Sequence, residues 1–204
     1  FRSQTWLALF RLVVSSLIGL IEDFLVVTDK VKYVGGGIKL KTRIAAVLFI
    51  GAIGAWWFFV KLGVSSIAIP FDGELTLGLL FIPFFMIVML ALFSGGVIDG
   101  LDGLSGGVFV SIFSAYGVIA YFQDQIDLAA LSLAIVGGLL AFLWFNIPPA
   151  RFYMSETGTL GLTTTLAVIA FLTKAVLVLP IIAFPLFVAS GSVIIQQLSK
   201  KFRN

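Results

Sequence analysis

Long apolar stretches separated by short polar segments dominate the hydropathy pattern of this chain. A helix that spans the hydrocarbon core of a bilayer needs roughly 17–25 mainly apolar residues. Stretches near this length recur, and they are apolar all round, as in helices surrounded by lipid. Seven spans are predicted, at about 5–21, 44–60, 75–93, 107–122, 128–147, 159–173 and 175–195. The pattern therefore predicts an all-α, polytopic transmembrane helical bundle that forms one integral-membrane domain over residues 1–204.

Composition supports the membrane class and narrows the chemistry. The chain is 60% hydrophobic and only 11% charged, whereas a soluble domain contains about a quarter charged residues. It has neither Cys nor His, which excludes disulfides, thiolate chemistry and the commonest general base. Carboxylates and Lys or Arg side chains are the groups left for any chemistry.

Basic residues fall mainly on one side of the predicted spans. Arg2, Lys61 and Lys174 lie on one side, and nine basic residues lie on the other: Lys30, Lys32, Lys39, Lys41, Arg43, Arg151, Lys200, Lys201 and Arg203. Because cytoplasmic segments of membrane proteins are enriched in Lys and Arg, the second side is predicted to be cytoplasmic. The net charge is only +3 and no basic run alternates with aromatic residues, so nucleic acid is not an expected partner.

The acidic residues divide in the same way. Four lie on the outer side in unpatterned loops and are interpreted as solvated charges: Asp72, Glu74, Asp124 and Asp127. Six lie on the predicted cytoplasmic side: Glu22, Asp23, Asp29, Asp99, Asp102 and Glu156. Most of these six adjoin apolar spans, where a carboxylate is costly unless it has a partner or a function.

The first acidic motif is Gly19-Leu20-Ile21-Glu22-Asp23, at the end of a predicted span. Two acids at a helix C-terminus oppose the helix dipole, so their placement costs stability. Simple solvation of a helix end is one explanation. A bound cation or a functional role would offset the cost.

The second motif extends from Ser94 to Gly107 and repeats Asp-Gly-Leu at Asp99 and Asp102. Residues three apart share a face of a helical turn, and glycines let the backbone approach a ligand closely. A flexible glycine linker with solvated acids is the alternative, although a linker does not require this repeat.

The third motif extends from Phe145 to Leu160. The paired prolines Pro148 and Pro149 end the fifth span. The loop then offers an amide, a guanidinium, two aromatic rings and a carboxylate, which suit an aromatic ring with attached phosphates. An aromatic belt at the membrane interface is the alternative.

Together the three motifs predict a Mg²⁺–diphosphate site at one membrane face. Mg²⁺ binds one or two carboxylates together with phosphate oxygens and waters, and Lys30, Lys39 and Lys41 are available for the phosphates. The predicted chemistry is phosphoryl transfer between a soluble nucleotide and a lipid-borne group.

The order of these motifs resembles that of the polyprenyl-phosphate hexosamine-phosphate transferases (glycosyltransferase family 4), most of all their phospho-N-acetylmuramoyl-pentapeptide transferase branch. Ile21-Glu22-Asp23-Phe24 resembles the family's Asp-Asp-Tyr motif, and residues 99–104 resemble Asp-Gly-Leu-Asp-Gly-Leu. Residues 145–160 resemble Phe-Asn-x-x-Pro-Ala…Phe-Met-Gly-Asp-x-Gly-Ser-Leu. Residues 192–196 resemble a late Ser-Val-Ile-x-Gln segment of the muramoyl branch.

The resemblance implies a Mg²⁺-dependent phospho-sugar transferase of the bacterial plasma membrane, with its active face in the cytoplasm. Its substrates would be UDP-N-acetylmuramoyl-pentapeptide and, from the lipid bilayer, undecaprenyl phosphate; its products would be lipid I and UMP. The implied catalytic residues are Glu22, Asp23 and Asp99, and the implied metal ligands are Asp23 and Glu156. The implied substrate-binding residues, with Tyr153 stacking on uracil, are Lys30, Lys41, Asp99, Asp102, Asn146, Tyr153 and Gln196. The oligomeric state stays open, a homodimer included.

The chain departs from the family pattern at several positions. Glu22 and Glu156 replace Asp, which lengthens each side chain by one methylene and moves the carboxylate by roughly one ångström relative to a Mg²⁺ shell. Gly96 replaces Asn, and Ser155 replaces Gly. The family's His-rich loop, two opening spans and last span have no counterpart in these residues. We therefore expect a chain truncated at both ends.

Three alternatives remain at this point. A sister enzyme would transfer N-acetylglucosamine phosphate to the same lipid, since the His-rich loop that selects the sugar is not in the sequence. A catalytically impaired homologue would bind nucleotide or proteins as a scaffold, as the two Glu residues and Gly96 suggest. A transporter would place its acids midway through the spans, whereas these lie at one face.

Overall fold

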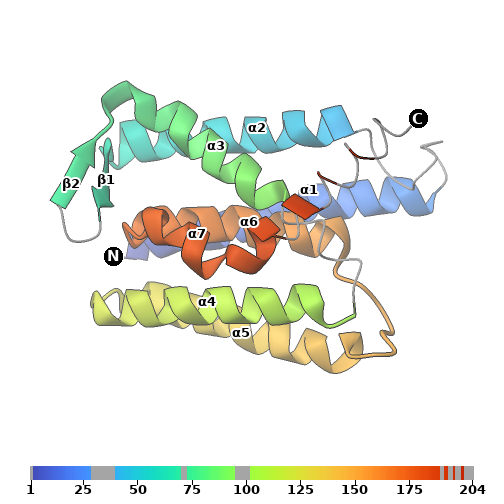
Figure 1. Cartoon of the computed structure of the whole chain (residues 1–204). Helices are drawn as coiled ribbons and strands as arrows, with labels where there is room; N and C mark the ends of the chain where they lie inside the picture. Colours follow the sequence, from blue (N-terminus) through green and yellow to red (C-terminus); the bar gives the residue numbers. More distant parts are fainter. Residues whose placement is uncertain are drawn as a thin grey trace.

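The computed structural model describes residues 2–28, 40–69, 73–94 and 102–188, together with 191, 192, 195 and 199. These residues form a bundle of helices that run roughly along a common axis (Figure 1). The principal helices are α1 (Arg2–Val27), α2 (Leu40–Trp56), α3 (Phe81–Ser94), α4 (Leu104–Phe122), α5 (Ile126–Asn146) and α6 (Ser155–Leu172). The prediction of an all-α polytopic membrane protein is confirmed.

Within the described part of the chain, four helices are long and apolar enough to cross a membrane: Arg43–Lys61, Leu104–Phe122, Ile126–Asn146 and Ser155–Leu172. The first of these continues α2 through a π-helical turn, η1 (Trp57–Lys61). The apolar helix over Gly78–Phe93 is shorter. The predicted number of seven spans is therefore approximate.

The predicted span 75–93 begins too early. Its first residues belong to the strand β2 (Gly73–Thr76), which pairs antiparallel with β1 (Ser66–Ile69) so that Ser66 lies opposite Thr76. The short 3-10 helix η2 (Gly78–Leu80) follows, and α3 begins at Phe81. A hydropathy window does not separate the alternating apolar residues of a short strand from the helix that follows it.

The predicted span 175–195 is interrupted. It consists of the 3-10 helix η4 (Val176–Val178), the short helix α7 (Leu179–Ile182) and helical residues 184–188. Pro180 and Pro185 lie in this stretch, and a proline lacks the N–H that a continuous helix requires. Most residues beyond 188 lie outside the described part of the chain.

Helix α6 forms the centre of the bundle. Every residue from Thr159 to Leu172 is buried, and α1 packs along this helix while α4 and α5 pack against each other. Hydroxyls of the buried threonines donate to carbonyls one turn earlier, as Thr163 does to Thr159 O at 2.7 Å. The hydroxyls of the buried threonines inside α6, Thr163, Thr164 and Thr165, are thus satisfied within their own helix.

Glycines permit the close approach of α1 and α6. A Cβ on Gly161 would contact the Ser16 hydroxyl and lie 3.4 Å from Leu12 O. Small residues at such contacts let helix backbones approach in a membrane, where packing rather than hydrophobicity drives association. Arg11 is buried in the same bundle and donates to Ile50 O of α2 at 2.7 Å.

At one end of the bundle, three connecting segments meet. Lys174 pairs with Glu74 of β2 at 2.5 Å, and Gln123 donates to Thr173 O at 2.8 Å. Hydrogen bonds from Lys174 and Ser66 hold the pKa of Glu74 below its ordinary value. The end of α1 and the starts of α4 and α6, which contain or adjoin Glu22, Asp23, Asp102 and Glu156, lie at the other end (Figure 1). The structure thus separates the described residues of the two groups as the alternation of spans predicts.

Candidate active site

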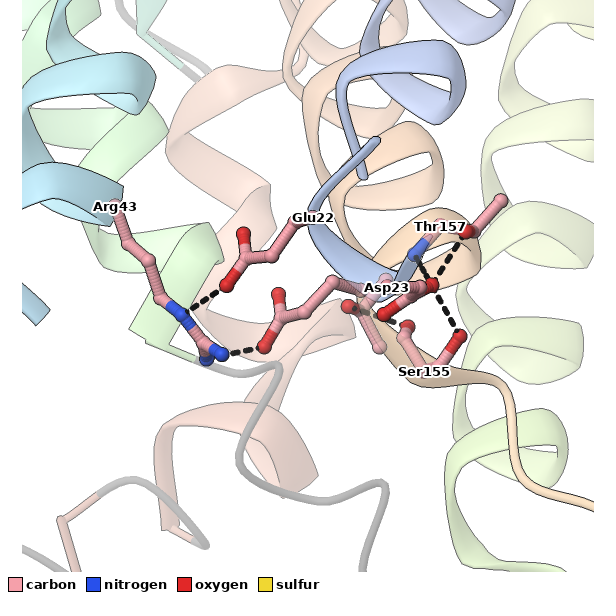
Figure 2. A network of polar contacts seen from close by, with 7 residues as sticks. Glu22, Asp23, Arg43, Ser155 and Thr157 are labelled. Atoms are coloured by element: carbon pink, nitrogen blue, oxygen red, sulfur yellow. Dashed lines mark hydrogen bonds and ion pairs between the residues drawn. The ribbon is translucent and has the colours of Figure 1, made fainter. Parts of the chain in front are cut away.

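The N-terminus of α6 is capped by a carboxylate from α1. Oδ2 of Asp23 accepts hydrogen bonds from Ser155 Oγ (2.7 Å), Thr157 N (3.0 Å) and Thr157 Oγ1 (2.5 Å), as Figure 2 shows. The residue at the N-cap position, Met154, makes no side-chain capping bond. The first N–H groups of a helix lack intrahelical partners and favour a negative charge. Asp23 supplies this charge from another helix.

Helices α1 and α6 lie so close together that the Asp23 side chain of α1 can reach the N-terminus of α6. A Cβ on Gly19 would lie 2.7 Å from the carbonyl carbon of Glu156 and 2.7 Å from Cα of Thr157, so only glycine fits. Ser155 has φ of 55°, a left-handed conformation that favours glycine. The family motif that residues 145–160 resemble has glycine at this position, and here the serine side chain adds a hydrogen bond to Asp23.

Arg43 of α2 links the other two acids of this cluster. Its Nε lies 2.5 Å from Oε1 of Glu22, and its Nη1 forms an ion pair with Oε1 of Glu156. All three side chains are largely shielded, with 23%, 10% and 25% of their surface exposed for Arg43, Glu22 and Glu156. The guanidinium therefore joins α2 to both α1 and α6.

A second cluster surrounds Asp102. Its Oδ1 accepts the Tyr153 hydroxyl at 2.7 Å and its Oδ2 accepts Ala150 N at 3.0 Å. These hydrogen bonds, the one from Tyr153 first, hold the pKa of Asp102 below its ordinary value. A carboxylate in this state accepts hydrogen bonds and does not donate them.

Asn146, at the end of α5, is fully buried and uses both ends of its amide. Its Nδ2 donates to Phe152 O, and its Oδ1 accepts Gly103 N, each at 2.9 Å. The amide thus positions the loop that contains Tyr153 relative to the start of α4. Its predicted contact with substrate stays a prediction.

The structure brings together most of the predicted site residues that it describes. Glu22, Asp23 and Glu156 form one cluster, and Asp102, Asn146 and Tyr153 form the other. Residues 153–156 connect the two clusters directly. Asp99, Lys30 and Gln196 lie outside the described residues, and Lys41 lies in the first turn of α2 with its side chain outside the description.

Arg43 was counted among the cytoplasmic basic residues but was not predicted as a site residue. Its position at the start of the second span, on the face that holds the acids, is the sequence feature that points to it. Only the fold shows that it reaches two carboxylates from different motifs.

The carboxylates of this cluster are compatible with a magnesium ion that also binds substrate. Within the described residues, no three His, Cys, Asp or Glu side chains converge as a self-sufficient metal site. Oε1 of Glu22 is buried and accepts no hydrogen bond, and Glu156 meets the same guanidinium. Mg²⁺ commonly uses one or two carboxylates together with substrate phosphates and waters, so Glu22 and Glu156 fit such a shell.

An apolar cavity adjoins the site. It has a volume of about 450 Å³ and extends between α1, α5 and α6 from Tyr153 and Thr157 to Leu12. Its other walls are mainly aliphatic and aromatic. Such a cavity suits hydrocarbon rather than a charged group.

The fold and the site define a polytopic helical membrane protein with two clusters of acidic, basic and aromatic side chains at one end of the bundle. Beyond this class, the chain belongs to glycosyl transferase family 4, whose sequence profile matches residues 5–174. This finding confirms the resemblance seen in the motifs.

The similar proteins are named phospho-N-acetylmuramoyl-pentapeptide-transferase. The one from Anoxybacillus flavithermus is 38% identical over 205 residues, which cover 98% of this chain and 61% of the relative. The one from Listeria monocytogenes is 35% identical over 197 residues, covering 95% and 60%. The one from Clostridium perfringens is 33% identical over 200 residues, covering 97% and 62%. The chain thus spans about three fifths of the length of these relatives.

Proposed function

We propose that this chain forms the membrane core of a phospho-N-acetylmuramoyl-pentapeptide transferase. The enzyme transfers the phospho-sugar from its UDP conjugate to undecaprenyl phosphate, and the products are lipid I and UMP. One observation supports this most directly. Asp23 of α1 caps the N-terminus of α6, and this brings the acidic motif of α1 next to Glu156 of α6. The names of the relatives support N-acetylmuramoyl-pentapeptide as the sugar of the proposed donor.

The Asp102 cluster is proposed to bind the uridine. Tyr153 is half exposed and offers a ring on which a base can stack. The Asp102 carboxylate accepts hydrogen bonds only, so it suits a donor of the nucleoside. Asn146 holds the backbone next to each of them, at Phe152 and Gly103.

The Glu22–Asp23–Glu156 cluster is proposed to bind the diphosphate region. Glu156, with either Asp23 or Glu22 as a second carboxylate, would hold a Mg²⁺ ion together with substrate oxygens, and the ion would neutralise phosphate charge. Lys30 and Lys41 are proposed to bind phosphates, Asp99 to act at the reacting group, and Gln196 to contact the sugar.

The proposed reaction is a displacement at the β-phosphorus of the UDP-sugar. An oxygen of the lipid phosphate forms a bond to this phosphorus, the bond to the oxygen that bridges the two phosphates breaks, and UMP leaves with that oxygen. Catalysis of this type depends mainly on positioning and on stabilising charge. The capping of α6 by Asp23 would fix the acids of α1 and α6 relative to the transferred group.

The membrane supplies the acceptor in this proposal. The acidic end faces the cytoplasm of the bacterial plasma membrane, where the UDP-sugar is soluble, as the distribution of Lys and Arg favours. The apolar cavity beside Tyr153 and Thr157 offers room for part of a hydrocarbon chain.

Release of UMP tests the proposal. The protein, expressed from its complete gene and purified in detergent, receives undecaprenyl phosphate, Mg²⁺ and either UDP-N-acetylmuramoyl-pentapeptide or UDP-N-acetylglucosamine. We expect UMP only with the muramoyl donor, and loss of turnover in Asp23→Asn and Asp99→Asn. UMP from UDP-N-acetylglucosamine alone would identify the sister reaction, and nucleotide binding without UMP from either donor would indicate a scaffold.

A further inference from the structure

Both glutamates of the acidic cluster contact the guanidinium of Arg43. Arg43 contacts Oε1 of Glu22 with Nε and Oε1 of Glu156 with Nη1, and these acids come from motifs more than a hundred residues apart. Figure 2 shows the guanidinium at the acidic pair of α1, next to the Asp23 cap.

The contact with Glu22 is a charge contact rather than a well-directed hydrogen bond. Nε of Arg43 and Oε1 of Glu22 are 2.5 Å apart, yet both atoms are buried and neither has a hydrogen-bond partner, because the N–H does not point at the oxygen. A buried polar atom without an aligned partner is costly. The carboxylate oxygen is therefore poorly satisfied by the arginine.

We infer that Arg43 occupies the cation position of this site in the metal-free protein and competes with a divalent metal ion for Glu22 and Glu156. This inference rests on the metal binding in the proposed function. A divalent ion would neutralise both carboxylates and would coordinate their oxygens directly, which the guanidinium does not do for Glu22. The two cations repel each other at such short range, so Arg43 leaves when the metal ion binds.

The chemistry of the three residues fits an exchange of this kind. Arg43 lies in the first turn of α2, so its long side chain can turn away through its own torsions without movement of the helix. Each glutamate is one methylene longer than the aspartate of the family pattern, which extends its reach toward the guanidinium. The arginine prevents two nearby carboxylates from facing each other without a counter-ion before the metal ion binds.

Binding of Mn²⁺, a paramagnetic substitute for Mg²⁺, tests the inference. The free ion is measured by electron paramagnetic resonance in titrations of the purified protein, expressed from its complete gene, first without nucleotide and then with saturating UDP, whose phosphate oxygens can complete the metal shell. We expect Arg43→Gln to bind Mn²⁺ at least about tenfold more tightly than the unmodified protein, because a partly buried competing cation is removed. Arg43→Lys keeps one positive charge but loses the planar guanidinium that contacts both carboxylates, so it should give an intermediate affinity.

The matched control is Lys174→Gln. It removes one positive charge and one ion pair with a glutamate, Glu74, at the opposite end of the bundle. Its Mn²⁺ affinity should equal that of the unmodified protein. Glu156→Gln, introduced together with Arg43→Gln, should abolish the gain, which locates the ion at these carboxylates.

Thermal unfolding gives a second measurement. Without metal, Arg43→Gln should unfold at a lower temperature than the unmodified protein, and saturating Mn²⁺ should raise its midpoint more than it raises that of the unmodified protein. If Arg43→Gln does not fold, Arg43→Lys replaces it, and tighter Mn²⁺ binding by this variant supports the inference.

Unchanged or weaker Mn²⁺ binding in the Arg43 variants, or no binding in any of them, would overturn the competition and leave Arg43 as a structural link. The outcome is separate from the test of function. If no UMP is released but the Arg43 variants bind Mn²⁺ more tightly, the proposed transferase activity is wrong and the competition between Arg43 and the metal ion stands. If UMP is released normally but Mn²⁺ binding is unchanged, the transferase activity stands and the competition is wrong.

Discussion

Two acids that are adjacent in the sequence have different partners in the structure. Glu22 pairs with Arg43, and Asp23 accepts hydrogen bonds from Ser155 and Thr157. Successive side chains of a helix point about 100° apart, so neighbouring residues can serve different helices. The N-terminus of α6 and the guanidinium offset the cost of placing two acids near the C-terminal end of α1.

Tyr153 and Asp102 permit a test at the same scale. Tyr153→Phe keeps the ring but removes the hydroxyl that contributes most to the lowered pKa of Asp102, so this pKa should rise toward its ordinary value. A lowered pKa in the folded state stabilises the protein above the unfolded-state pKa, and the stabilisation disappears as pH falls through the folded-state value. The unfolding temperature of Tyr153→Phe should therefore be lower at neutral pH, and its difference from the unmodified protein should shrink below about pH 4.

The control for this prediction is Tyr121→Phe. Tyr121 is exposed near the end of α4, far from Asp102. Its replacement should leave the pH dependence of unfolding unchanged. A difference for Tyr153→Phe that is the same at every pH would contradict the role of its hydroxyl.

At the scale of elements, the pairing of α1 with α6 determines the geometry of the acidic cluster. Both helices are long, and glycines allow their backbones to approach at Gly19 and Gly161. The hydrogen bonds of Asp23 cross this interface at its site end. The position of the acids therefore depends on the distance between two helices rather than on the flexibility of a loop.

Gly19→Ala tests this dependence. The added Cβ would meet the backbone of Glu156 and Thr157, so the helices must separate, at a cost of roughly 1–3 kcal/mol in stability. Displacement of reacting groups by about 1 Å can lower a rate on the order of a hundredfold, so UMP release should fall more than stability alone explains.

Gly137→Ala is the comparison for Gly19→Ala. Gly137 is in the interior of α5 and is exposed, and a Cβ there meets nothing within 4 Å. Its replacement should change stability by less than about 1 kcal/mol. Equal behaviour of the two variants in thermal unfolding and UMP release would contradict the proposed importance of the α1–α6 contact.

At the scale of the whole molecule, the two ends of the bundle differ in character. One end contains the hairpin and the Glu74–Lys174 pair, and the other contains both clusters of the candidate site. The Lys and Arg distribution predicts that the site end faces the cytoplasm. This orientation would give the site access to a soluble nucleotide on the side where it is made.

Because these 204 residues contain no Cys, single cysteines can report the orientation. Asp127→Cys places a thiol at the start of α5 at the outer end, and Arg151→Cys places one in the exposed loop at the site end. A membrane-impermeant maleimide should label the first variant in intact spheroplasts and the second only after permeabilisation. The reverse pattern would invert the proposed topology.

How much of this was predictable from the sequence depends on the range of the interactions. The apolar length of each stretch is a local property, so most helices and the alternation of their connections were predicted correctly. The early start of the span 75–93 and the unbroken span 175–195 were wrong, because a strand and two prolines interrupt stretches of uniform hydropathy. The motifs indicated which residue types belong to the site.

The sequence by itself thus determined the membrane class, the family and the face on which the acids gather. Only the tertiary structure decided that Asp23 caps α6, that Arg43 joins Glu22 to Glu156, and that Asn146 is used within the protein. The sequence of a helix that is apolar on every side does not indicate which helices it packs against, because lipid and protein surfaces are equally apolar and packing selects the partners. These contacts join residues up to 134 positions apart, beyond the reach of any local pattern.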